Sequence, residues 1–576
     1  MNFSKWTDAA RAVFFALCAS AQPLIAEPDR KVIVVPGIVG SVLEDDAGQI
    51  AWGQVDSLLK RNFDRLNLLP EDGAPVALQP KDALREIPLV FGAFDIGFYG
   101  PLIDFMVGDK SFKDVVTGQD IFGDYTEGED LFVFAYDWRR SNFSNAQKLN
   151  DFVKEKIPDG ERFDIVAHSM GGLVTRLFLS DRRPVDACTS SNVATTLSSD
   201  DLTTLCNAVY GDVSGAVWPS DAAMPSASEA ARLHTFIEIA VPHKGSVNVA
   251  GTLTEGWGKI SELLLGGKRN IQNNVLSMTA PYELVPTYEN CCAMGVTGAI
   301  GNNPVPARDE SYWADLVLGF GKVPCPYSNC DTKRRILQIG LANRGVIDQI
   351  IADGLPSSVE DNHVIVGRQV KGTKETVYVK GDAGDGEGLS YRFSIDGDGT
   401  VYEGSAKASG NLAAVLRSSH PFIVGSEETE RYIYNFLVDP IADIPDPVND
   451  DTWKFAGGTV IGRSLEVAPH VATPATTLDI TLDLSSLKTS LFEEDGLKDA
   501  TVVATLSNVE TGDEVGQIDL SLDEAATRLR RGVAVYRGTV EAPADQGVYT
   551  VSAVSLEGSS RRNALVQQFL YILEEE

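Results

Sequence analysis

The sequence has few basic residues for its length. Its 576 residues include 49 Lys and Arg against 81 Asp and Glu, which gives a formal net charge of −32. Such a chain repels the phosphates of nucleic acids and gains no electrostatic attraction to anionic lipid surfaces. The composition therefore argues against a nucleic-acid partner. It fits a well-solvated protein of the extracellular or periplasmic space, or of a saline habitat.

Cysteine is also scarce, with seven residues in the chain. No Cys-x-x-Cys pair or paired histidine spacing accompanies them, so we expect no zinc site. Cys18 lies in a segment that we expect to be removed, which leaves an even number for disulfides. Cys188 and Cys206 are close enough in sequence to close a small loop, as are Cys325 and Cys330, and the spacing leaves the connectivity open.

The N-terminal segment lacks a hydrophobic run long enough to span a bilayer. A basic start is followed by a short apolar stretch, with small residues near possible cleavage points after Ala21 or Ala26. This pattern predicts a signal peptide over residues 1–26, although Asp8 is unusual in such a leader. An amphipathic N-terminal helix is the alternative. With the signal peptide, we expect a secreted or periplasmic protein.

Residues 162–173 have the pattern of a short strand that turns directly into a helix. Apolar residues of strand type precede Ala-His-Ser-Met-Gly, and apolar residues at helical spacing follow from Leu173. Ser169 then lies at the apex of the turn, which is the nucleophile elbow of an α/β-hydrolase. Gly171 and Ala167 supply the small side chains that the close passage of strand and helix requires. An ordinary serine in a strand–helix turn is the alternative.

Residues 31–41 predict a buried strand that ends in a glycine-rich loop. In hydrolases with such an elbow, one oxyanion donor is the N–H of the residue after the nucleophile, here Met170. The second donor comes from a loop after an early strand, and the Ile38 N–H is our candidate. The positive end of the helix that follows Ser169 adds to this stabilisation.

A serine nucleophile needs a histidine base, and the base needs a carboxylate that holds its tautomer. In this fold the chain order is serine, then acid, then histidine. Asp398 follows a predicted strand, Tyr391–Ile395, and His420 follows in a loop that enters a helix. We therefore predict that Ser169, Asp398 and His420 form the catalytic triad.

The other histidines fit this role less well. His363 lies in a predicted strand before the acid, and His470 lies beyond the predicted hydrolase domain. His243 also precedes the acid and could line the pocket, whereas His168 is expected to brace the elbow. We expect replacement of His243 to leave catalysis intact.

Clustered carboxylates near the predicted acid offer calcium binding as an alternative, because they are ligands that hard cations prefer. The carboxylates are those of Asp382, Asp385, Glu387, Asp396 and Asp398. Their spacing does not match the twelve-residue calcium loop. We therefore expect no metal ion and no cofactor.

Alternating strand and helix patterns predict an α/β-hydrolase domain with a mostly parallel sheet over residues 27–442. Less regular segments at about 43–90, 184–232 and 281–335 predict cap or lid insertions. In the first of these, Trp52 begins an apolar stripe at helical spacing, which either faces the core or forms a mobile flap.

The composition changes after Pro440. Residues 443–475 are typical of a linker, and residues 476–576 contain apolar residues at period two, such as Leu478, Ile480 and Leu482. This pattern predicts an all-β immunoglobulin-like sandwich with no catalytic constellation. The sandwich could bind a surface or protein partner, or cover the hydrolase.

The motifs, in chain order, resemble the lecithin:cholesterol acyltransferase-like family, which includes acyltransferases and phospholipases. The matching segments are Val34–Glu44, Tyr136–Arg139, Ala167–Gly172, Asp396–Val401 and the late His420. The resemblance implies the same triad and the same two oxyanion donors. It also implies that Trp52 is the lid tryptophan and that the substrate is a lipid acyl ester, met at a membrane or lipoprotein-like interface.

Two departures from the family pattern stand out. Ala167 replaces the usual glycine, and residues 242–246, Pro-His-Lys-Gly-Ser, occur where lipid acyltransferases more often carry a tryptophan. We therefore expect a serine-dependent lipid acyl-ester hydrolase or O-acyltransferase. The sequence does not decide which molecule accepts the acyl group. A non-catalytic hydrolase-like binding protein, or an esterase or amidase acting on other substrates, is the alternative.

Overall fold

The structure is a computed structural model. It describes residues 30–53, 62–70, 74–85, 90–91, 94–95, 99–113, 120–185, 199–211, 227–255, 268–289, 291–295, 308–313, 329–368, 373–380, 389–394, 396–438, 454–455, 458–469, 471–486, 491–508, 513–555 and 563–572. The predicted signal peptide, the carboxylates of Asp382, Asp385 and Glu387, and His470 lie outside these residues.

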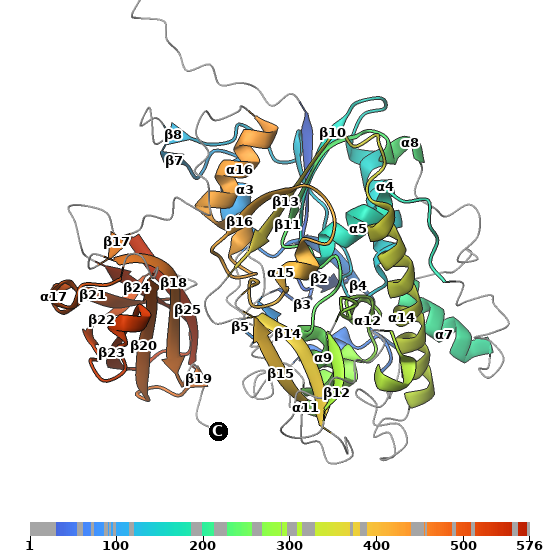
Figure 1. Cartoon of the computed structure of the whole chain (residues 1–576). Coiled ribbons are helices and arrows are strands. Elements are labelled where there is room, and N and C mark those ends of the chain that lie inside the picture. Colours follow the sequence, from blue (N-terminus) through green and yellow to red (C-terminus); the bar gives the residue numbers. More distant parts are fainter. Residues whose placement is uncertain are drawn as a thin grey trace, which may run out of the picture.

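A parallel sheet of six strands lies at the centre of the described part of the first 438 residues (Figure 1). Its order is β16 (Leu412–Leu416), β13 (Asp361–Gly367), β11 (Leu233–Ile239), β10 (Phe163–His168), β1 (Lys31–Val35) and β9 (Leu131–Val133). Each neighbouring pair is parallel. The predicted parallel sheet is confirmed.

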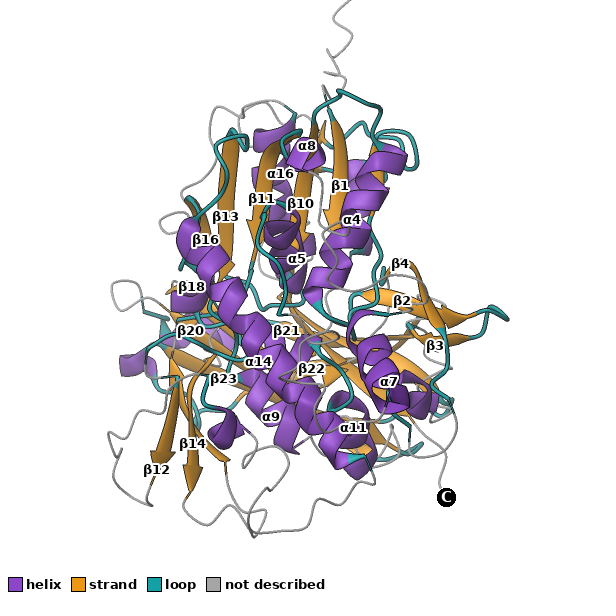
Figure 2. Cartoon of the chain, turned by 90° about the vertical axis from the view of Figure 1, so that its right-hand side faces the viewer, coloured by secondary structure: helices purple, strands orange, loops and turns teal. Residues whose placement is uncertain are grey.

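Both faces of this sheet are covered by helices (Figure 2). Val32 and Val34 of β1 pack on one face, while Ile33 and Val35 pack on the other, because successive side chains of a strand alternate. This burial on both sides explains why β1 reads as a continuous apolar run. One face is covered by α4 (Asn142–Lys156), α5 (Met170–Phe178) and α14 (Cys330–Asp353), the other by α3 (Gly100–Met106) and α16 (Glu427–Leu437).

Shorter elements fill the excursions from the sheet. The strands are β2 (Ser41–Asp45), β3 (Ile50–Trp52), β4 (Leu78–Ala83), β5 (Val90–Phe91), β6 (Phe94–Asp95), β7 (Phe112–Lys113), β8 (Asp120–Ile121), β12 (Cys292–Gly295), β14 (Thr373–Lys380) and β15 (Leu389–Ser394). The helices are η1 (Asn62–Leu66), α7 (Ser199–Tyr210), α8 (Ala227–Ala230), α9 (Asn248–Glu255), α11 (Lys268–Val275), α12 (Ala280–Glu283), α15 (Glu403–Ala406) and η3 (Ile423–Gly425).

Trp52 corrects one expectation. It lies in strand β3 rather than in a helix, and its side chain is fully buried. The indole N–H donates to the Val39 carbonyl at 2.8 Å, and the ring packs edge-on against Trp138 with centroids 5.4 Å apart. The helical interpretation is wrong for this residue, because pairing with β2 overrides an apolar spacing that both helices and cores produce.

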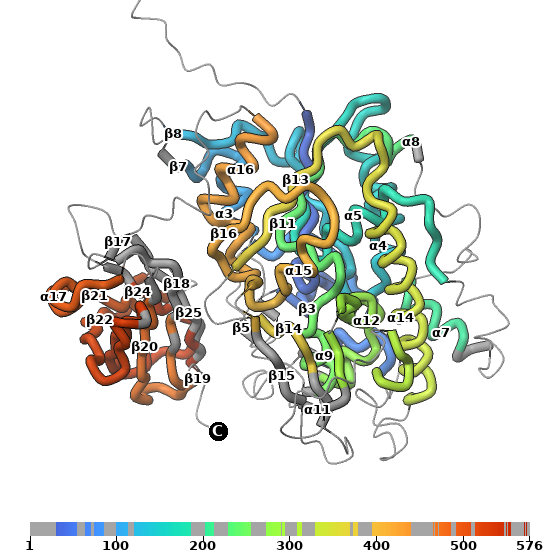
Figure 3. The backbone as a smooth tube through the Cα atoms, viewed as in Figure 1, coloured from blue at the N-terminus to red at the C-terminus, as the bar shows by residue number. Residues whose placement is uncertain are grey.

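The C-terminal strands form a mostly antiparallel sheet around a separate apolar core, and Figure 3 follows the chain into it from blue to red. The described strands run in the order β17 (Lys454–Phe455), β18 (Gly458–Ala468), β20 (Thr477–Ser486), β23 (Val533–Glu541), β22 (Glu514–Leu522), β21 (Val502–Asn508), β24 (Gly547–Ser555), β25 (Asn563–Ile572) and β19 (Val471–Ala472). Two short helices, α17 (Glu494–Asp499) and η4 (Leu529–Arg531), accompany them. The all-β prediction is confirmed for these residues. A single continuous strand order does not establish the predicted immunoglobulin-like sandwich of two sheets.

The described cysteines are bonded. Cys291 and Cys292 form a disulfide between neighbouring residues, which the spacing argument did not anticipate. Cys206 and Cys330 are also disulfide-bonded. Among the helices that the structure describes, none combines the length and the apolar character needed to span a bilayer.

Candidate active site

Ser169 lies in a strained turn between β10 and α5. Its backbone has φ 54° and ψ −127°, a conformation that L-residues rarely adopt. The helix passes so close to the end of β1 that a Cβ on Gly171 would lie 2.4 Å from the Pro36 carbonyl oxygen. Glycine is therefore required at this position. Ala167, by contrast, is accommodated fully buried in β10.

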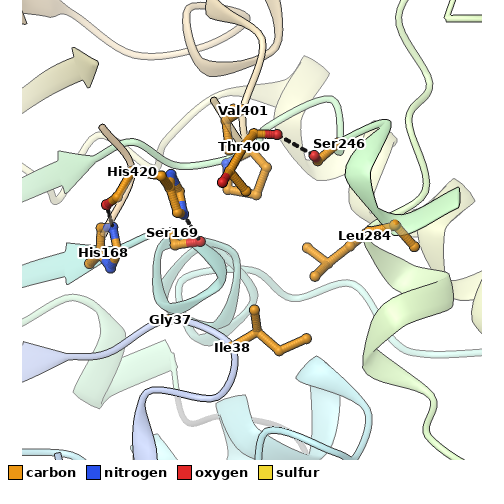
Figure 4. Close-up of a pocket in the computed structure, with 11 residues that line it drawn as sticks. Gly37, Ile38, His168, Ser169, Ser246, Leu284, Thr400, Val401 and His420 are labelled. Atoms are coloured by element: carbon orange, nitrogen blue, oxygen red, sulfur yellow. Dashed lines mark hydrogen bonds between the residues drawn. The ribbon is translucent and has the colours of Figure 1, made fainter. Parts of the chain in front are cut away.

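Three predicted side chains meet in one hydrogen-bonded line. Figure 4 shows two of them, Ser169 and His420, facing each other. Ser169 Oγ lies 2.8 Å from Nε2 of His420, and Nδ1 of the same ring lies 2.7 Å from Oδ2 of Asp398. Since an ionised carboxylate only accepts, we assign the proton to Nδ1, which leaves Nε2 to accept from the serine hydroxyl. In this arrangement the imidazole can withdraw the serine proton.

The carboxylate of Asp398 is held by further donors. Its Oδ1 accepts the N–H groups of Thr400 at 2.9 Å and Val401 at 2.7 Å, while Oδ2 faces the imidazole. The His420 N–H also donates to the Asp398 carbonyl at 2.9 Å. Acid and base are thus joined through both backbone and side chain.

The calcium alternative finds little support near this acid. Asp396 forms an ion pair with Arg368 at 3.2 Å, and the Asp398 carboxylate already accepts three hydrogen bonds. Within the described ranges, no group of three or more His, Cys, Asp or Glu side chains is placed to hold a metal ion.

Residues 36–40, which we call the oxyanion loop, lie directly against Ser169. A Cβ on Gly37 would lie 2.8 Å from Cβ of Ser169. The Gly40 N–H donates to the Gly37 carbonyl at 3.1 Å, and the Gly37 N–H donates to Tyr99 Oη at 2.7 Å. Neither bond uses the Ile38 N–H. The Met170 N–H is at the first turn of α5, where helical N–H groups have no partner within the helix.

A cavity lies beside Ser169, and most of its wall is apolar (Figure 4). The apolar lining residues are Ile38, Pro242, Val249, Leu284 and Val401. Ser246 and Thr400 also line it, and they are hydrogen-bonded to each other. Trp52 is not part of this wall. Such a wall suits an apolar group attached to the bond under attack.

Two other histidines have purely internal partners. His243 is fully buried, with Nε2 at 2.7 Å from the Glu238 carboxylate and Nδ1 at 2.7 Å from the Ala406 carbonyl. His243 is not among the residues that line the cavity beside Ser169. The His363 ring stacks on Phe436 with centroids 3.6 Å apart, and burial lowers its pKa.

Sequence reasoning missed the partners of these histidines. Glu238 also accepts from Arg176 at 2.6 and 2.7 Å and from Asn362 at 2.9 Å. A glutamate in the middle of the apolar run of β11 was the available signal, because a buried carboxylate requires a partner. Tyr99, which contacts the oxyanion loop, carried no signal of its own.

The family model described as lecithin:cholesterol acyltransferase matches residues 97–293. A curated relative, lecithin-cholesterol acyltransferase-like 4 of Arabidopsis thaliana, is 27% identical over 175 residues, which cover 27% of this chain and 32% of the relative. The resemblance to the lecithin:cholesterol acyltransferase-like family is confirmed.

The matched segment, residues 97–293, covers only part of the candidate site. It contains Ser169 and Met170, whereas Asp398 and His420 lie beyond its end. The chain thus spans about a third of the length of the acyltransferase-like relative that it matches. Among solved structures, a Bacillus licheniformis lipase, BlEst2, in mature form aligns over 72% of this chain and 93% of its own, with 13% identity and a TM-score of 0.24.

Proposed function

We propose that this protein is a serine-dependent lipid acyl-ester hydrolase or O-acyltransferase that works through an acyl-enzyme. The observation that carries the proposal is the line from Ser169 Oγ through the His420 imidazole to the Asp398 carboxylate, with distances of 2.8 and 2.7 Å. These lengths suit general-base activation of a hydroxyl, and the carboxylate fixes the tautomer that this requires.

In the acylation step, Nε2 of His420 takes the hydroxyl proton while Ser169 Oγ forms a bond to the ester carbonyl carbon. The carbonyl oxygen becomes an oxyanion, and we propose that the N–H groups of Ile38 and Met170 stabilise it. The imidazolium then gives its proton to the leaving alcohol as the ester C–O bond breaks. An acyl group remains on the serine.

In the second step, water or an alcohol gives a proton to Nε2 of His420 and attacks the acyl carbon. The bond between that carbon and Ser169 Oγ then breaks, the imidazolium returns the proton to the serine oxygen, and an acid or a new ester is released. The apolar cavity wall and the family match over residues 97–293 both favour a lipid substrate. An enzyme of this kind meets its substrate at a membrane or lipoprotein-like interface. Trp52 lies outside the matched residues 97–293, so it stays our candidate lid tryptophan through the resemblance of the sequence motifs alone, and it is buried here.

The organisation of the chain completes the proposal. We infer a removed signal peptide over 1–26 and secretion or periplasmic export, a hydrolase domain over 27–442 with insertions, a linker over 443–475, and a sandwich over 476–576. The antiparallel C-terminal core is compatible with an immunoglobulin-like sandwich that contacts a surface or a protein partner.

The decisive test combines covalent labelling with product analysis. A fluorophosphonate probe should label the wild-type protein and fail to label Ser169→Ala. The wild type is then incubated with triglyceride, phospholipid and short-chain esters, with and without an alcohol acceptor. Release of acid indicates a hydrolase, and ester formation indicates an acyltransferase. Absence of labelling would instead favour a non-catalytic binding protein, and turnover of amides alone would indicate an amidase.

A further inference from the structure

A chain of hydrogen bonds connects the oxyanion loop to the backbone of His420 through two side chains that have no role in the mechanism above. The Gly37 N–H donates to Tyr99 Oη at 2.7 Å. Tyr99 Oη lies 2.8 Å from Nδ1 of His168, whose Nε2 lies 3.1 Å from the His420 carbonyl oxygen. Tyr99 and His168 are only 1% and 3% exposed, so water competes little for these bonds.

The direction of every bond in this chain follows from the chemistry of its ends. A carbonyl oxygen only accepts, so Nε2 of His168 carries a hydrogen. Burial, together with the neighbouring His420, lowers the pKa of His168 well below its ordinary value, so the ring is neutral and Nδ1 accepts. Tyr99, whose pKa burial raises, therefore donates its hydroxyl to Nδ1 and accepts the Gly37 N–H.

Both ends of the chain are parts of the candidate site. At one end, the Gly37 N–H is committed to Tyr99, and the next N–H along the loop belongs to Ile38, the proposed oxyanion donor. At the other end, His168 holds the His420 carbonyl while Asp398 accepts the His420 N–H at 2.9 Å. The backbone of His420 is thus held through both its carbonyl and its N–H.

We propose that Tyr99 and His168 are positioning residues that hold the oxyanion loop and the His420 imidazole in register around Ser169. The proposal rests on the proposed function. It adds that one chain of hydrogen bonds positions both the oxyanion donor and the histidine that transfers the proton. Three elements contribute to it, since Tyr99 precedes α3, His168 ends β10, and Gly37 follows β1. A small displacement of either end would separate two groups that must act on the same carbonyl.

Tyr99→Phe tests this connection, because it removes one oxygen and keeps the ring that packs in the core. We expect kcat to fall ~10- to 100-fold with KM within ~2-fold, since misplaced groups lose transition-state rather than ground-state interactions. An alkyl boronic acid, which forms a tetrahedral adduct with the serine, should lose affinity in parallel with kcat/KM. A purely structural role would lower the melting temperature without this split.

Tyr536→Phe is the matched control. Its hydroxyl is also buried and donates to a backbone carbonyl, that of Leu497, at 2.8 Å, but it lies in the C-terminal core. This variant should keep the wild-type kcat and boronate affinity.

A second pair of variants tests the other link. His168→Gln keeps a side-chain N–H that can reach the His420 carbonyl, whereas His168→Leu offers no donor. We expect the glutamine variant to retain at least ~5-fold more kcat than the leucine variant, since it preserves a hydrogen bond to the base. Equal losses in both variants would contradict the assigned direction at this link.

Hydrogen exchange gives a readout that needs no substrate. In Tyr99→Phe, amide exchange should accelerate ~10-fold or more in residues 36–40 and also in residues 416–422, because both ends lose their common anchor. Unchanged exchange at 416–422 together with a wild-type kcat overturns the connection. Coupled acceleration in a protein that the fluorophosphonate does not label would keep the connection and overturn the proposed function.

Discussion

Two histidine–carboxylate pairs lie buried at the same edge of the parallel sheet, yet only one has the form of a catalytic site. His420 and His243 each place one ring nitrogen 2.7 Å from a carboxylate. The other nitrogen of His420 faces the Ser169 hydroxyl, whereas that of His243 faces the Ala406 carbonyl. A carbonyl has no proton to give, so His243 cannot act as a base.

The surroundings of the two carboxylates differ as well. Burial by itself raises the pKa of Glu238, but the ion pair with Arg176 and the contact with His243 outweigh it and lower the pKa to about 2. Among the described residues, no Arg or Lys pairs with Asp398, and its Oδ1 is held by two backbone N–H groups. A close His–carboxylate pair is therefore a poor sign of catalysis, and the group that faces the second nitrogen is a better one.

The largest effect on kcat should come from removing the Ser169 hydroxyl, which faces the second ring nitrogen of His420. Ser169→Ala leaves His420 and Asp398 in place but no nucleophile, so kcat should fall ~10⁵- to 10⁶-fold. Ester hydrolysis measured with the best substrate of the panel checks this, with circular dichroism to verify the fold. Full activity in this variant would end the serine mechanism.

Replacing the two histidines in parallel tests the comparison directly. His420→Ala should lower kcat by ~10⁵-fold or more, because the serine loses its base. His243→Ala should keep kcat within ~3-fold and lower the melting temperature, since it leaves buried oxygens unpaired at a cost of ~1–3 kcal/mol. An inactive His243→Ala beside an active His420→Ala would reverse the assignment.

Replacing the carboxylates of Asp398 and Glu238 should likewise affect kcat in one case and stability in the other. Asp398→Asn keeps the size of the side chain but favours the wrong imidazole tautomer, so kcat should fall ~10⁴-fold with little change in stability. Glu238→Gln should instead lower stability and keep kcat. Steady-state kinetics and urea unfolding of both variants give the answer, and a large kcat loss confined to Glu238→Gln would contradict it.

The smallest expected effect is a change in the free energy of unfolding with pH. The pKa of Glu238 is about 2 in the folded state against 4.5 ordinarily, so its contribution to stability is complete above pH 4.5 and is lost as the pH falls toward 2. Relative to Glu238→Gln, the wild type should lose up to about 3 kcal/mol of unfolding free energy over this window. Urea unfolding at pH 6 and pH 3 measures it, and a pH-independent difference would contradict the ion-pair account.

Much of the candidate site could be predicted because its signals are local. The elbow at Ser169 follows from strand and helix periodicity across a few residues, and chain order then selects Asp398 and His420. The interpretation of Trp52 failed for the same reason, because an apolar residue in a short segment carries no information about which strand will pair with it.

From its own local patterns, the sequence determined the parallel sheet, the position of the candidate nucleophile, and the choice of the candidate acid and base. Only the tertiary structure decided that Tyr99 joins the oxyanion loop to His168. It also decided that a ring nitrogen of His243 contacts Glu238, whereas a ring nitrogen of His420 contacts the Ser169 hydroxyl. Periodicity is a property of neighbouring residues, whereas the partner of a buried polar atom depends on which distant segments the packed core brings within about 3 Å.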